Sequence, residues 1–281
     1  MRDIHVDQIS GTVADLFIDA THNLPDDVVA ALQRARDNEE SLLGRQIVEE
    51  ILENATLARE EMIPLCQDTG TSVVFVEIGQ EVHIAGGSLE EAINRGVAKG
   101  YTEGFLRKSM VETPFSARKN TGDNTPAVIH VDLVPGDRLR LKVLPKGGGC
   151  ENMSRMTILL PGQGREGIVN FVLRAVEEAS GNPCPPLVLG VGIGGTAEYC
   201  MVLAKKAITR KVGAPNPDAE TADLERELLD KVNALGLGPQ AVGGTVTALA
   251  VHVETFPTHI TALPVAVNMQ CHSARLKEAD L

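Results

Sequence analysis

Three of the five cysteines in this chain lie in turn-forming segments that are far apart in the sequence. They are Cys66, Cys184 and Cys271, and proline or polar residues stand beside each of them. Three thiolates can hold a cubane iron–sulfur cluster and leave its fourth iron open, where that iron acts as a Lewis acid on a substrate hydroxyl. Spacing alone does not separate this chemistry from the commoner case of cysteines buried as small hydrophobes.

The short sequence motifs around these cysteines are more specific for a protein family than the cysteine spacing is. They are LCQDTG at residues 65–70, PKGGGCENMS at 145–154, NPCPP at 182–186 and GVGIGGT at 190–196. Together, in this order, they closely resemble the α subunit of the oxygen-sensitive, iron–sulfur class I fumarase and L-tartrate dehydratase family. The resemblance covers nearly the whole chain, from about residue 8.

The resemblance implies a cofactor and its ligands. It implies a [4Fe–4S] cluster held by Cys66, Cys184 and Cys271, with one iron open to substrate. Cys150 stands where the family often has a serine, and Cys200 falls in a predicted helix, so we expect neither to be a ligand.

The polar residues after Cys66 are candidates for substrate contact. The resemblance implies that Gln67 and Thr69 bind substrate and that Asp68 handles a proton or orients a partner. An alternative for Asp68 is an Asx-type turn cap, which needs no substrate.

Three further positions match the family's active site. Arg107 is predicted to bind a substrate carboxylate, which a planar guanidinium suits, although a cation at a helix C-terminus is favourable anyway. Gly149 ends a run of three glycines after Lys146, whose bare amides could approach an anion. His259 is predicted to be catalytic.

A second subunit is also implied. Single-chain members of the family continue into a domain that supplies the catalytic base, whereas this chain ends ten residues after Cys271. We therefore expect a β subunit to complete the site, in an α2β2 assembly.

The resulting prediction is an α subunit of a hydro-lyase that interconverts (S)-malate and fumarate, a reaction of the tricarboxylic acid cycle. L-Tartrate dehydratase is the close alternative, with a mesaconate-type hydratase behind it; Lys146 and residues 151–153 favour the fumarase. A non-catalytic scaffold and a nicotinamide-dependent oxidoreductase are rivals from other classes. The second depends only on the glycines at 190–195, which we expect to serve close helix packing.

Composition narrows the partners. The chain has 281 residues, a net charge of −12 and no tryptophan, which argues against nucleic acid. No signal peptide or apolar run of membrane-spanning length is visible, and the unpaired cysteines fit a reducing cytoplasm.

Periodicity predicts a mixed α+β (α/β) fold in one domain, residues 1–281. A helical segment, about 1–62, should precede mixed sheets with flanking helices. Strands at 128–133 and 139–144 should pair as a hairpin, and late strands are expected at 245–253 and 259–267.

Overall fold

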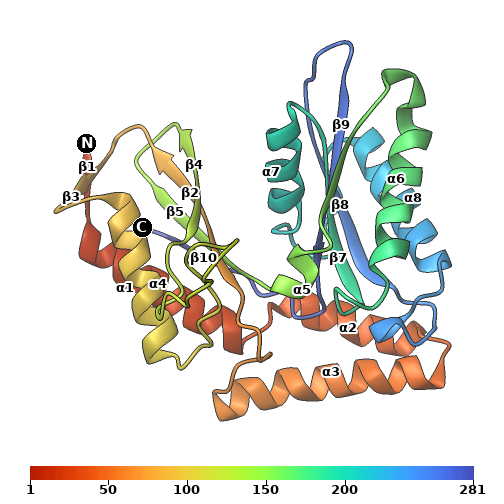
Figure 1. Cartoon of the computed structure of the whole chain (residues 1–281), viewed down its shortest axis with the longest axis horizontal. Helices are drawn as coiled ribbons and strands as arrows, with labels where there is room; N and C mark the ends of the chain where they lie inside the picture. Colours follow the sequence, from red (N-terminus) through yellow and green to blue (C-terminus); the bar gives the residue numbers. More distant parts are fainter. The chain divides into compact units, whose positions relative to one another are not determined.

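The structure is a computed structural model that describes residues 1–281 (Figure 1), and the chain forms two compact units. Unit 1 comprises Met1–Pro25, Ala55–Gly148 and Arg275–Leu281, and unit 2 comprises Asp26–Asn54 and Gly149–Ala274. Each unit has its own sheet and its own hydrophobic core. The expectation that residues 1–281 act as one domain stays a prediction.

The N-terminal region is helical, as predicted. A short strand, β1 (Arg2–His5), leads into α1 (Val6–His22), and α2 (Asp26–Asn38) and α3 (Leu42–Glu61) follow. Strand β1 pairs in parallel with β3 (Val82–Ala85) in a small separate sheet.

Unit 1 is built on a four-stranded sheet in the order β10-β5-β2-β4. Its strands are β2 (Thr71–Gly79), β4 (Val128–Val134), β5 (Leu139–Lys146) and β10 (Lys277–Asp280). Helices α1 and α4 (Leu89–Glu103) pack against each other, and their apolar side chains share a core with those of β2 and β5.

The predicted hairpin of residues 128–133 and 139–144 is wrong. Both strands exist, but β2 lies between them, parallel to β4 and antiparallel to β5. The run of valine and phenylalanine at 73–76 in β2 is buried on both faces, and a strand buried in this way takes a central place in a sheet.

Unit 2 contains a second four-stranded sheet, in the order β6-β9-β7-β8. Its strands are β6 (Arg155–Leu159), β7 (Leu187–Gly194), β8 (Ala248–Phe256) and β9 (Leu263–Gln270). Figure 1 shows α7 (Ala197–Ala207) on one face, with α6 (Gly164–Ala179) and α8 (Ala219–Ala234) on the other. The short elements are α5 (Gly148–Glu151), η1 (Pro161–Gln163) and η2 (Pro239–Ala241).

The glycines at 190–195 serve packing, as expected. The strand runs on to Gly194, so Gly190 and Gly192 lie inside β7 and not in a turn after it. A Cβ at either position would stand 2.0 Å from a carbonyl oxygen of α7, Ala204 O or Cys200 O respectively. The close approach that these glycines permit is made by a helix of the same unit.

The late strands begin later than predicted. Because β8 starts at Ala248 and β9 at Leu263, His259 lies in the connection between them and not in a strand. The mixed α/β class itself is confirmed. None of the helices combines the length and the apolar character needed to cross a bilayer.

Candidate active site

Cys66 lies in residues 64–70, an irregular stretch between α3 and β2 that we call the Cys66 segment. Its entry is anchored by buried Leu65, whose backbone N–H donates to Thr21 O at 2.9 Å. The half-buried Cys66 sulfur accepts a hydrogen bond from the backbone N–H of Asp68, with 3.4 Å between N and Sγ. The cysteine therefore stands at the start of a turn that folds back on it.

Side chains from distant parts of unit 1 hold the backbone carbonyls of the Cys66 segment. The hydroxyl of Tyr101 lies 2.8 Å from Thr69 O and 3.1 Å from Gly70 O, and the amide of Asn124 donates to Gly70 O at 3.1 Å. Arg275 donates to Asp68 O. Burial raises the pKa of Tyr101 to about 12, so its hydroxyl keeps the proton that it donates.

Asp68 uses its carboxylate within the protein. Oδ1 accepts the N–H of Gly70 at 3.0 Å, and Oδ2 accepts the N–H of Gly148 at 2.7 Å. The first contact is the Asx-type turn that the sequence left open as an alternative. The second occupies an amide of the glycine run, so this amide is not bare as we had expected.

The other polar residues near Cys66 differ in whether their side chains are free to contact a ligand. Gln67 is exposed, whereas Thr69 is buried and donates its hydroxyl to Arg107 O at 2.9 Å. The Arg107 side chain is exposed just after α4. Unit 1 thus brings Gln67, Asp68, Thr69 and Arg107 together, with Gln67 and the Arg107 side chain open to a ligand.

Gly70 is required by the backbone. It has φ +84°, and an added Cβ would stand 2.7 Å from Lys146 N and Pro145 C. The Lys146 side chain is buried directly before the glycine run. Both features fix the Cys66 segment against the end of β5.

Unit 2 carries the other two predicted ligands. Cys184 is exposed, with a left-handed φ of 56°, and Cys271 is half-buried directly after β9. The backbone N–H of His272 donates to Cys184 O at 3.4 Å, which brings the two cysteine loops of this unit together. These loops, residues 181–186 and 271–274, are called the unit 2 loops below.

The remaining predicted site residues of unit 2 lie on short irregular stretches. Gly149 is exposed in α5, and a Cβ there would stand 3.2 Å from Asn182 O, next to the Cys184 loop. His259 is exposed, and its Nδ1 lies 2.8 Å from Thr261 Oγ1.

The five cysteines separate by accessibility. None forms a disulfide; Cys66, Cys184 and Cys271 are half-buried or exposed, whereas Cys150 and Cys200 are buried. Burial also raises the pKa of the Cys200 thiol, which disfavours the thiolate that a metal needs. The three accessible thiols are the predicted ligands, so the donor set suits an iron–sulfur centre. The structure contains no preassembled group of three or more metal-binding side chains.

A comparison with protein families matches most of the chain. The sequence model described as "Fumarate hydratase (Fumerase)" matches residues 10–280. The chain belongs to this family. It is therefore related to hydro-lyases, and the match spans both units.

Curated relatives align over almost the whole chain. The "Putative L(+)-tartrate dehydratase subunit alpha" of Methanocaldococcus jannaschii is 42% identical over 95% of this chain and 95% of its own length. The L(+)-tartrate dehydratase subunit alpha of Escherichia coli O157:H7 is 35% identical over 98% of this chain and 93% of its own. The E. coli K12 protein of the same name is 34% identical over the same shares.

Sequence reasoning missed three residues of this family member that shape the Cys66 segment: Tyr101, Asn124 and Arg275. Each acts on backbone carbonyls from 31 to 207 positions away in the sequence. No local pattern marks such a contact.

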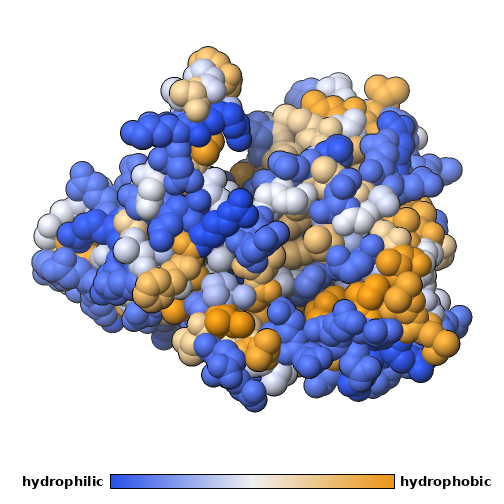
Figure 2. All heavy atoms as spheres, turned by 60° about the horizontal axis from the view of Figure 1, so that its bottom comes forward, coloured by the Kyte–Doolittle hydropathy of each residue, from blue (hydrophilic) through white to orange (hydrophobic).

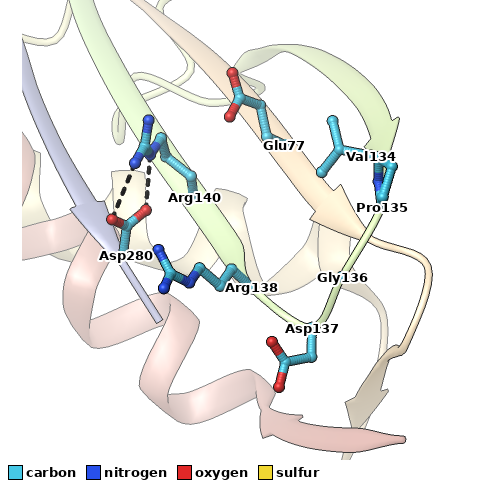
Figure 3. A pocket seen from close by; sticks show the side chains of 8 residues that line it. All are labelled: Glu77, Val134, Pro135, Gly136, Asp137, Arg138, Arg140 and Asp280. Atoms are coloured by element: carbon cyan, nitrogen blue, oxygen red, sulfur yellow. Dashed lines mark hydrogen bonds and ion pairs between the residues drawn. The ribbon is translucent and has the colours of Figure 1, made fainter.

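A separate hollow of about 250 Å³ lies elsewhere on unit 1 and holds none of the predicted site residues. Figure 3 shows its charged rim, with Glu77 on β2, Arg138 directly before β5, Arg140 on β5, and Asp280 on β10. Arg140 binds Asp280 through two hydrogen bonds of 2.7 and 3.1 Å, which lower the pKa of that carboxyl. The pair ties the C-terminal strand to the sheet.

Hydrophobic side chains also reach the surface. Figure 2 shows them as separate groups among hydrophilic ones on the face it displays. On α3 the exposed ones include Leu42, Leu43 and Leu57. Exposed hydrophobic residues that stand in separate groups are normal on protein surfaces.

Proposed function

We propose that this chain is the iron–sulfur α subunit of a hydro-lyase that adds water to, or removes it from, a four-carbon dicarboxylate. Membership of the fumarate hydratase family supports the reaction class. The observation that carries the cofactor is that the three accessible cysteines are the three that match the family's ligands.

Cys66, Cys184 and Cys271 would hold the cluster. When bound, a [4Fe–4S] cluster with three thiolate ligands supplies one iron with an open position, a Lewis acid for the substrate hydroxyl. Two of the thiols belong to neighbouring loops of unit 2 and the third to unit 1.

Gln67 and Arg107 would bind the substrate. Both are exposed in unit 1, and the guanidinium offers a fork that matches a carboxylate. Thr69 would act indirectly, because its hydroxyl already fixes the backbone of Arg107. Asp68 would orient the glycine run next to Gly149, since both of its oxygens accept backbone amides.

Proton transfer would need more than this chain. His259 is exposed and is the candidate for orientation or proton handling in unit 2. The name "subunit alpha" of the relatives supports a β subunit that supplies the base, and we propose an α2β2 assembly in the cytoplasm.

Two substrates have specific support. Lys146 and the Glu151–Met153 stretch favour malate and fumarate, whereas the names of the relatives favour L-tartrate as the second candidate. Anaerobic co-expression with candidate β subunits, followed by assays with malate, fumarate, L-tartrate and mesaconate, separates the two. Turnover of L-tartrate at least about tenfold above that of malate would reverse our order of preference.

Cluster uptake tests the cofactor. After anaerobic reconstitution the chain should absorb near roughly 400 nm, as thiolate-bound iron–sulfur centres do. Serine at Cys66, Cys184 or Cys271 should abolish this band, whereas Cys150→Ser, the matched control, should keep it. A colourless wild type would contradict the proposal.

The substrate clamp is tested at Arg107. Loss of one charge-assisted contact to a carboxylate costs roughly 2–4 kcal/mol, so Arg107→Ala should lower kcat/KM by about 30- to 1,000-fold in the assembled enzyme. Arg107→Lys should restore little. Arg118→Ala, an exposed arginine of the same loop, is the control. Unchanged kcat/KM in Arg107→Ala would show that Arg107 does not bind substrate and is only a favourable charge near the C-terminus of α4.

A further inference from the structure

The backbone around Asp68 is held from three sides. Gly70 N and Gly148 N donate to its two carboxylate oxygens, at 3.0 and 2.7 Å, and Arg275 donates to its backbone carbonyl. Its remaining polar group is the backbone N–H, which donates to Cys66 Sγ at 3.4 Å. Every polar group of this residue is therefore engaged, and the last one points at a predicted cluster ligand.

Arg275 is an unusual residue to find here. Its side chain is only 1% exposed, forms no ion pair, and leaves Nε buried without a hydrogen-bond partner. A guanidinium stays charged at any ordinary pH, and burying a charge without a carboxylate is costly. A tie to one backbone carbonyl could be made at lower cost by a neutral amide, as Asn124 does for Gly70 in the same segment.

The position of the charge offers a reason. Arg275 lies close enough to Asp68 and Tyr101 for its charge to oppose the rise in the Tyr101 pKa. The same guanidinium polarises the Asp68 carbonyl that it contacts. Fixed hydrogen bonds from backbone amides to ligand sulfurs, together with local charge, set the reduction potential of iron–sulfur centres.

We infer that Arg275 is a positioning residue for Cys66: it fixes the Asp68 backbone so that the Asp68 N–H is held on the ligand sulfur. The consequence of this contact, a cluster stabilised in its reduced form, rests on the proposed function. The contact between Arg275 and Asp68 does not. A role limited to anchoring the C-terminal strand is the competing explanation, since β10 begins two residues later.

The first arm of the test needs no cluster. In the full-length, metal-free chain, hydrogen exchange at the Asp68 amide should be at least about tenfold faster in Arg275→Lys and Arg275→Gln than in the wild type. The matched control is Arg140→Gln, which removes the ion pair between β5 and β10 without touching Asp68 and should change exchange there by less than about twofold.

The second arm uses the reconstituted chain. Redox titration should show the equilibrium of the cluster shifted about tenfold toward the oxidised form in Arg275→Lys, which is 59 mV for a one-electron couple. Arg140→Gln should titrate like the wild type. Unchanged Asp68 exchange and an unchanged potential in Arg275→Lys, with only a lower melting temperature, would overturn the inference and leave Arg275 as a strand anchor. A wild type that takes up no cluster would count against the proposed function, and the exchange arm would still decide whether Arg275 positions Asp68.

Discussion

The Cys66 segment of unit 1 and the unit 2 loops each carry a cysteine predicted to be a cluster ligand, but they are held in different ways. Tyr101, Asn124 and Arg275 tie the carbonyls of the Cys66 segment from far away in the sequence. In the unit 2 loops, Cys184 N donates to Gly181 O at 3.0 Å within a local turn, and His272 N donates to Cys184 O at 3.4 Å between the two loops. The first predicted ligand therefore stands in a segment held by side chains from distant parts of unit 1, whereas the other two stand in loops held to each other by a backbone hydrogen bond, with Cys184 exposed and Cys271 half-buried.

The largest effect should come from Gly70, where the Cys66 segment touches the end of β5. Gly70→Ala places a Cβ against backbone atoms at 2.7 Å in a left-handed conformation, and should cost at least about 4 kcal/mol of unfolding free energy. Gly136→Ala is the matched control, with φ +99° and no atom within 4 Å, and should cost only about 1–2 kcal/mol. Equal losses of unfolding free energy for Gly70→Ala and Gly136→Ala in chemical denaturation would show that the Cys66 segment shifts to accept the Cβ. The Cys66 segment would then be no more firmly held than the unit 2 loops.

Acid should act on unit 2 first. Burial, with nearby Arg210, lowers the pKa of His252 from 6.5 to about 4, so the folded state keeps this ring neutral while the unfolded chain binds a proton. The stabilisation is complete above pH 6.5 and is lost as the pH falls toward 4, a change of about 3 kcal/mol. Glu225 and Asp27 also face the ring and oppose part of the shift.

Glu39, also in unit 2, should likewise make the folded state less stable in acid. Its burial raises the carboxyl pKa, but hydrogen bonds from Ser41, Thr245 and Val246 outweigh this and lower it, so its stabilisation is also lost on acidification. Chemical denaturation at pH 7 and pH 5 should show the loss of unfolding free energy that His252 causes, and His252→Leu should remove most of it; the Glu39 contribution is lost only below pH 4.5. Amides of unit 1 that exchange before those of unit 2 at pH 5 would contradict this order.

Substitution of one amide side chain in each region tests how firmly the Cys66 segment and the unit 2 loops are held. Buried Asn124 accepts from Ser109 N at 2.7 Å and donates to Gly70 O and Ser72 Oγ, so Asn124→Ala should cost about 2–3 kcal/mol. Gln240 contacts Pro185 O next to Cys184, but its own backbone N–H makes the same contact at 2.9 Å. Gln240→Ala should therefore cost less than about 1 kcal/mol by thermal unfolding. A larger loss for Gln240→Ala would reverse the comparison.

The smallest effect is kinetic. In the metal-free chain, Cys184 is exposed whereas Cys66 is half-buried and hydrogen-bonded. Iodoacetamide should label Cys184 about tenfold faster than Cys66, with Cys150 and Cys200 slower than both, as read by peptide mass spectrometry. Equal rates for Cys66 and Cys184 would indicate that the Cys66 segment opens freely.

Sequence reasoning recovered what short-range patterns encode. The helices of residues 6–61, the packing role of Gly190 and Gly192 and the mixed fold class follow from periodicity and glycine placement. Sequence reasoning failed for strand pairing, which depends on contacts between residues far apart in the sequence. The linker at residues 134–137 reads as a hairpin turn, but the order of the strands is set by the burial of β2.

The site shows the same division. Cys66, Cys184 and Cys271 were predicted as ligands from the motifs around them, and the structure leaves these three accessible, while their role as ligands stays a prediction. The side chains that shape the Cys66 segment were not found, because a buried arginine on a carbonyl has no sequence signature. The roles of Gln67, Arg107, Gly149 and His259 stay predictions.

The arrangement of unit 1 has a consequence for the order of synthesis. Its three pieces are the first 25 residues, the stretch from Ala55 to Gly148, and residues 275–281, so all of unit 2 beyond Asn54 is translated before unit 1 can close. Domains generally fold as they leave the ribosome, N-terminal parts first. Here the unit that begins first closes last, and Arg275 reaches Asp68 only after the codons for all five cysteines have been read. A nascent chain stalled between Cys271 and Arg275 would carry all three predicted cysteine ligands, while the Cys66 segment would still lack the hydrogen bond from Arg275.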